Sequence, residues 1–108
     1  MDRMLSGIKP SGKLTLGNYI GAIRNFIKYQ DEYELYVFIA NLHAITVHQD
    51  KKELKQNIKD IAALYIACGL DPEKVTLFIQ TDVMEHAQLG FILNCHSYMG
   101  ELSRMTQF

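Results

Sequence analysis

Three short apolar runs, separated by stretches with helical periodicity, constrain the fold of this chain most strongly. The runs cover residues 4–8, 35–40 and 75–79 of a 108-residue sequence. Parallel strands need a crossover connection of a dozen or more residues, usually a helix, and both intervals are long enough for one. The alternation therefore predicts an α/β fold, a parallel sheet with flanking helices. The second run is apolar throughout, which is typical of a parallel strand covered on both faces.

The stretch after the first run predicts a helix from about residue 17 to residue 29. Its apolar side chains recur at steps of four, three and four residues, which places them on one stripe of a helix. The stripe consists of Leu16, Ile20, Ile23 and Ile27. A later helix is expected over residues 84–98, with Asp82 and Glu85 as its N-terminal capping pair.

Capping signals delimit another helix between the second and third apolar runs. Asp50 with Glu53 three residues later is an aspartate version of the capping box, and Gly69 supplies a C-terminal stop. The side chains expected on the buried stripe of this helix are Leu54, Ile58, Ile61 and Tyr65.

Charge and cysteine content narrow the class of protein. Five of the eleven basic residues lie within residues 1–30, against one acidic residue there, which suits a polyphosphate but is too sparse for a nucleic-acid surface. Cys68 and Cys95 have no zinc spacing with the histidines, so we expect two reduced, partly buried thiols in a cytoplasmic protein. We expect no signal peptide because strand-like residues begin at Met4, and no apolar run reaches the roughly 18 residues of a membrane span.

A glycine-rich turn, GIKPSG at residues 7–12, follows the first apolar run. A turn that leaves a strand and enters a helix is where α/β proteins hold phosphates, because the helix N-terminus offers free N–H groups. The dinucleotide fingerprint G-x-G-x-x-G is absent. The turn nearly matches a P-loop, but Leu14 lacks the hydroxyl that would bind Mg²⁺ and Pro10 lacks an N–H. Ligands of parallel sheets bind beyond the carboxyl ends of the strands, where residues 41–43 also lie.

Four blocks, at residues 7–12, 15–22, 43–46 and 100–108, resemble the bacterial type of tryptophanyl-tRNA synthetase. The segment TLGN at residues 15–18 corresponds to the class I synthetase signature His-Ile-Gly-His. The tyrosine enzymes are the sister family, and the closing block favours tryptophan over tyrosine. The resemblance implies that residues 1–108 are the N-terminal part of a Rossmann-like, nucleotide-binding catalytic domain in a longer chain.

The resemblance also implies a reaction and its partners. The carboxylate of tryptophan attacks the α-phosphate of ATP in the presence of Mg²⁺, and the aminoacyl group then passes to tRNA(Trp). No protein nucleophile or protein-bound metal is needed, so catalysis is mainly placement and charge stabilisation. A cytoplasmic homodimer is expected for the whole protein.

Particular residues carry these roles by resemblance. Thr15 and Asn18 would be catalytic, donating to the phosphate oxygens, although either could simply cap the first helix. The residues expected to bind ATP are Lys9, Pro10, Ser11, Gly17 and Asn18.

The tryptophan pocket would contain Leu5, Gly7, Ala40 and His43. Two of the residues near it depart from the family pattern. Many relatives have an aromatic residue at the position of Leu5, so stacking on the indole would be weaker or come from elsewhere. Asn41 stands where aspartate is expected and lacks its charge. His48, His86 and His96 are interpreted as structural or surface residues.

Other family parts do not occur within these residues. The Lys-Met-Ser-Lys-Ser loop is absent, and the residues that read the indole N–H in relatives come after Phe108. We therefore expect little or no synthetase activity from the isolated chain. The alternative is a non-catalytic module that binds a nucleotide or pairs with another protein. The apolar side chains of the last helix and the tail could form a dimer surface or pack into the core: Leu89, Phe91, Ile92, Leu93, Met99, Leu102, Met105 and Phe108.

Overall fold

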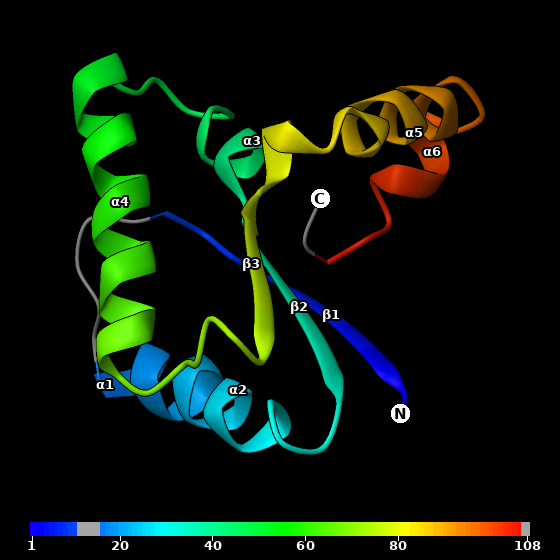
Figure 1. The fold of residues 1–108 in the computed structure, drawn as a ribbon. Helices are drawn as coiled ribbons and strands as arrows, with labels where there is room; N and C mark the ends of the chain where they lie inside the picture. Colours follow the sequence, from blue (N-terminus) through cyan, green and yellow to red (C-terminus); the bar gives the residue numbers. More distant parts are fainter. Residues whose placement is uncertain (11–15, 107–108) are drawn as a thin grey trace.

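The computed structural model describes residues 1–10 and 16–106 and contains a three-stranded parallel sheet. The strands are β1 (Arg3–Ile8), β2 (Glu34–Ile39) and β3 (Val75–Ile79), in the order β1-β2-β3. Both pairings are parallel, with β2 in the centre (Figure 1). The predicted α/β fold with a parallel sheet and flanking helices is confirmed.

One face of the sheet forms the core. Leu35, Val37 and Ile39 of β2 are at most 2% exposed. They face α2 (Arg24–Tyr29) and α4 (Lys51–Ala67), which lie together on one side of the sheet (Figure 1). The buried side chains that this helical layer contributes are Ile23, Phe26, Ile61 and Tyr65.

The opposite face of the sheet is only partly covered within the described residues. Tyr36 and Phe38, which alternate with the core residues of β2, are half-buried. α5 (Met84–Cys95) and α6 (Met99–Leu102) lie on the side of the sheet away from α4 (Figure 1). The expectation that β2 is covered on both faces is therefore wrong for the described part of the chain, because α5 reaches only part of this face.

The first helical segment has the predicted extent but not the predicted buried stripe. It comprises α1 (Leu16–Asn18), a π-helical turn (Tyr19–Ile23) and α2. Leu16 and Ile20 are 73% and 51% exposed, whereas Ile23 is buried. A π turn places more residues in each turn than an α-helix, so side chains before and after it no longer share one stripe.

The capping signals of α4 are confirmed. The Glu53 N–H donates to Asp50 Oδ2 at 3.0 Å, and α4 begins at the next residue, Lys51. Gly69 follows the helix with a φ of +120°, a conformation that glycine adopts without steric cost. On the predicted stripe, Ile61 and Tyr65 are buried, and Leu54 and Ile58 are half-buried.

The capping pair predicted for α5 is wrong. Asp82 belongs to a 3₁₀ turn, Gln80–Asp82, and the residue that precedes α5 is Val83, whose side chain has no acceptor. The helix also ends at Cys95, before the predicted residue 98. To cap α5, Asp82 would have to stand directly before its first residue. The helix begins at Met84 instead, with Val83 between them.

The expected burial of the cysteines is met only in part. Cys68 is half-buried, but Cys95 is exposed.

Most apolar residues of α5, α6 and the tail are exposed: Leu89, Phe91, Ile92, Leu93, Met99 and Met105. Leu102 is half-buried, and Phe108 lies outside the described residues. Within the described ranges, no helix has the length and apolar character needed to cross a membrane.

Candidate functional site at the carboxyl edge of the sheet

The three strands end side by side, and hydrogen bonds join the segments that follow them. The Ala40 N–H, just after β2, donates to the carbonyl oxygen of Ile8 in β1 at 2.7 Å. Asn41 Nδ2 donates to Thr81 Oγ1 at 2.9 Å, which links β2 to the turn after β3. The residues after all three strands are therefore held at one edge, where parallel sheets bind ligands.

The residues expected to bind ATP flank the first turn at this edge. Lys9 is exposed and Pro10 is buried directly after β1, and Gly17 is exposed in α1. Ser11 and Thr15 lie outside the described residues, and the side chain of Asn18 is not described either. The predicted roles of these six residues in binding ATP and its phosphates stay predictions.

The four residues expected to bind tryptophan lie in two places. Leu5 and Gly7 are on the partly open face of β1, and Leu5 lines a cavity of about 280 Å³ on that face. Ala40 is half-buried at the end of β2. His43 is exposed in the short helix α3 (Asn41–Ala44). Neither Ala40 nor His43 lines this cavity, so the structure brings only part of the expected set together.

The cavity beside Leu5 has apolar walls and two polar side chains. β2 contributes Phe38, α5 contributes His86, Leu89 and Leu93, and Gln80 follows β3. Three side-chain atoms at this edge are buried without a hydrogen-bond partner in the described part of the chain: Gln80 Oε1, His86 Nδ1 and Asn41 Oδ1. Buried polar groups normally have a partner, and an unpaired one costs about 1–3 kcal/mol. Of these three residues, Gln80 and His86 line the cavity, which places an amide and an imidazole where a ligand with its own polar groups would bind.

An aromatic cluster forms one wall of the cavity. The His86 ring meets the Phe38 ring edge to face, with centroids 5.5 Å apart and an interplanar angle of 68°. Phe78 lies 6.0 Å from Phe38 and 6.1 Å from His86, again between ring centroids. Sequence reasoning missed Phe38 and Gln80 and treated His86 as structural or surface. The position of Gln80 directly after a strand was a usable signal, because the same rule had drawn attention to Asn41.

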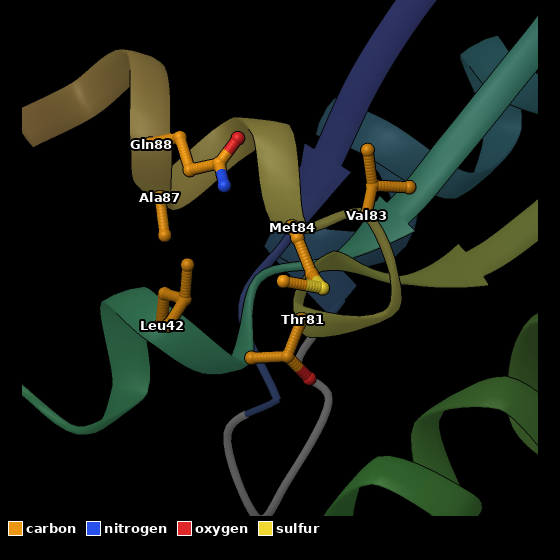
Figure 2. Close-up of a pocket in the computed structure, with 6 residues that line it drawn as sticks. All are labelled: Leu42, Thr81, Val83, Met84, Ala87 and Gln88. Atoms are coloured by element: carbon orange, nitrogen blue, oxygen red, sulfur yellow. The ribbon is translucent and has the colours of Figure 1, made fainter. Parts of the chain in front are cut away.

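A second cavity, of about 220 Å³, lies between α3 and the start of α5. Figure 2 shows Leu42 of α3 and Ala87 of α5 pointing toward one another across it. Thr81 and Met84 line it from the segment after β3. Its lining is almost wholly apolar, and it adjoins the Asn41–Thr81 hydrogen bond.

An ion pair with shifted pKa values lies at the other end of the sheet, where the strands begin. The Tyr36 hydroxyl and Arg3 Nε both donate to the Glu34 carboxylate, at 2.7 and 2.9 Å, and these bonds lower the pKa of Glu34. The same contact with Glu34 raises the pKa of Tyr36. This exposed cluster is separate from the carboxyl edge. The cavity at the carboxyl edge is lined by apolar, amide and imidazole groups, which are suited to binding and positioning a ligand.

Comparison with known proteins identifies similar chains along the whole length. The family model for class I tRNA synthetases (W and Y) matches residues 2–108. The tryptophan--tRNA ligase of Bacillus anthracis is 56% identical over 108 residues, which are all of this chain and 33% of that protein. The tryptophan--tRNA ligase of Bacillus subtilis (strain 168) is 58% identical over 105 residues, 97% of this chain and 32% of that protein.

Solved structures are also similar to this chain over all or nearly all of its length. The tryptophanyl-tRNA synthetase from Mycoplasma pneumoniae superposes with a TM-score of 0.95 at 47% identity, over 100% of this chain and 32% of that one. The Campylobacter jejuni enzyme complexed with ADP and tryptophan has a TM-score of 0.86 at 43% identity, over 94% of this chain and 32% of that one. The chain thus spans about a third of the length of these relatives.

Proposed function

Because the chain belongs to the class I tRNA synthetases for tryptophan and tyrosine, we propose that the protein carrying it is a tryptophan--tRNA ligase. The observation that carries the proposal is the 56% identity, over all 108 residues, to a relative named tryptophan--tRNA ligase. The protein would activate tryptophan with ATP and transfer it to tRNA(Trp). This chain would be the N-terminal part of the nucleotide-binding catalytic domain.

In the proposed first step, the chain positions ATP at the turn after β1. Lys9, Pro10, Ser11, Gly17 and Asn18 would bind ATP. Gly17, without a side chain, would let adenosine approach the backbone closely. Thr15 and Asn18 would donate to phosphate oxygens, which gather charge as pyrophosphate leaves. The described residues contain no group of three acidic, histidine or cysteine side chains that could hold a metal ion. We propose that Mg²⁺ binds through the ATP phosphates.

Tryptophan would bind on the adjacent part of the carboxyl edge. Leu5, Gly7, Ala40 and His43 would surround it, and its carboxylate would attack the α-phosphate of the neighbouring ATP. The hydrogen bond from Ala40 to Ile8 supports this proposal because it fixes the end of β2 against the end of β1. Holding two substrates in reactive geometry lowers the barrier, and stabilisation of the phosphate charge lowers it further.

The remaining partners are proposed for the whole protein. The tRNA would bind mostly through regions outside these residues. A homodimer is supported by the exposed apolar surface of α5 and α6, because large contiguous apolar patches on a soluble protein mark interaction sites. The cytoplasmic location expected from the sequence stays a prediction.

ATP–pyrophosphate exchange by the natural product of this gene tests the proposal, with tryptophan, tyrosine or no amino acid added. We expect stimulation by tryptophan alone. Stimulation by tyrosine would assign the protein to the sister specificity within the same family. A folded protein with no exchange in either case would instead be a non-catalytic nucleotide-binding or dimerisation module.

A further inference from the structure

The ring of Phe38 occupies space that a side chain at residue 7 would need. Gly7 and Phe38 are directly paired between β1 and β2. A Cβ atom added to Gly7 would lie 2.5 Å from Phe38 Cζ and 2.6 Å from Cε2. The tip of the Phe38 ring therefore lies against the backbone of β1 at Gly7, which shares its face of the strand with Leu5.

Two neighbouring rings pack against Phe38. His86 of α5 lies at 5.5 Å between ring centroids in an edge-to-face pair, and Phe78 of β3 lies at 6.0 Å. Aromatic pairs at such distances contribute stability beyond the area they bury. Phe38 is therefore held in one position on β2, while its remaining surface lines the cavity of about 280 Å³.

Leu5 lines the same cavity but offers a different surface. Its side chain is 60% exposed and aliphatic. An aromatic residue is expected at this position from the resemblance to the family, so the stacking surface for an indole has to come from another residue or be lost. Phe38 is the aromatic side chain of the cavity lining that lies across from Gly7.

We propose that Phe38 is a specificity-determining residue, which provides the aromatic surface that Leu5 lacks for packing against the indole ring of the substrate. This inference rests on the proposed tryptophan site at Leu5 and Gly7. The ring fits at this place on β2 because Gly7 of β1 has no side chain there. His86 acts as a positioning residue that holds the Phe38 ring.

The test is tryptophan-dependent ATP–pyrophosphate exchange by the natural gene product, with separate KM values for tryptophan and ATP. Phe38→Leu removes the ring but keeps an apolar side chain. We expect the KM for tryptophan to rise about five- to tenfold, the order of an aromatic contact. The KM for ATP should not change. The melting temperature of each variant is measured in parallel, and Phe38→Met replaces Phe38→Leu if the latter does not fold.

The matched control is Tyr33→Leu. Tyr33 also belongs to an aromatic pair, with Tyr29 at 5.6 Å between ring centroids, but it precedes β2 at the other end of the sheet and does not line the cavity. We expect its KM for tryptophan to stay within twofold of the unchanged protein. Adding Leu5→Phe to Phe38→Leu should restore part of the lost affinity, because a ring then returns to the other side of the cavity.

The outcomes separate the two proposals. An unchanged or lower KM for tryptophan in Phe38→Leu, or equal effects of Phe38→Leu and Tyr33→Leu, would contradict the role of Phe38 while leaving the synthetase assignment intact. Absence of tryptophan-dependent exchange in the unchanged protein would contradict the proposed function, and the role of Phe38 with it.

Discussion

The two faces of the sheet are built from alternate residues of the same strands, yet they are packed in opposite ways. On the core face, Leu35, Val37 and Ile39 are nearly inaccessible and belong to one cluster of buried apolar and aromatic side chains. On the other face, Leu5 is 60% exposed, and Gln80 and His86 keep buried polar atoms unpaired within the described part of the chain. The comparison indicates that the core face stabilises the chain, whereas the other face is the one on which we propose that a ligand binds.

The largest effect on stability should come from the core face. Ile39→Ala removes a side chain that is 2% exposed and leaves a cavity, so we expect the free energy of unfolding to fall by about 3 kcal/mol. Urea unfolding of the 108-residue chain, followed by circular dichroism, measures it. Leu5→Ala, on the other face, is the control and should cost less than about 1 kcal/mol. Equal losses for the two variants would remove the distinction between the faces.

Gly7→Ala tests how tightly the second face is packed where the Phe38 ring lies. The added Cβ would be 2.5 Å from Phe38 Cζ, so the ring has to move, and we expect a loss of about 2 kcal/mol. Thermal unfolding measures the loss, and Phe38→Leu in the same chain should recover much of it. Gly21→Ala is the control, because a Cβ there meets nothing within 4 Å in the described residues. Full stability of Gly7→Ala would mean that the ring is not held in place.

The pH dependence of stability should report on the core face through Tyr65. Burial raises the pKa of Tyr65 to about 12 from its usual 10, with a smaller contribution from Cys68. Below pH 10 the hydroxyl is protonated in both states and stability is unaffected. Above pH 10 the unfolded chain loses this proton first, so stability falls toward pH 12.

The measurement is urea unfolding at pH 7 and pH 11 of the unchanged chain and of Tyr65→Phe. We expect the variant to be more stable than the unchanged chain by about 1 kcal/mol at the higher pH, relative to their difference at pH 7. Tyr98→Phe changes an exposed tyrosine and should follow the unchanged chain. The same alkaline loss in Tyr65→Phe as in the unchanged chain would show that this hydroxyl is not buried.

The smallest effect, of opposite sign, should come from Gln80. Its Oε1 is buried without a partner within the described residues, so Gln80→Leu removes an unpaired polar atom. We expect a gain of up to about 1 kcal/mol in the free energy of unfolding, measured by thermal denaturation. Gln88→Leu, at an exposed position of α5, should change stability little. A clear loss in Gln80→Leu would mean that its amide makes a stabilising contact in the folded chain.

Local signals in the sequence were sufficient for much of the fold. Asp50 and Gly69 delimit α4 because each acts on backbone groups within a few residues of itself. The run Val75–Ile79 is the observed β3. The π turn at Tyr19–Ile23 was not predictable from spacing, because a helical stripe presumes a constant number of residues per turn.

The site was less predictable because it depends on pairing between distant residues. Phe38 meets Gly7 only through the register of β1 and β2, and His86 reaches Phe38 only because α5 turns back over the sheet. Neither contact can be predicted from the residues that are close to it in the sequence. The roles proposed for Lys9 and Gly17 came from the resemblance to the family. Their part in binding ATP stays a prediction.

The central position of β2 also bears on the order in which the chain can fold. Arg3 of β1 pairs with Glu34, 31 residues later, and Leu35 of β2 pairs with Val75, 40 residues later. No strand finds a partner close in sequence, so loop closure precedes every pairing, which favours slow folding. During synthesis, β1 and β2 can meet before β3 leaves the ribosome, and the waiting edge of β2 is then open to other chains.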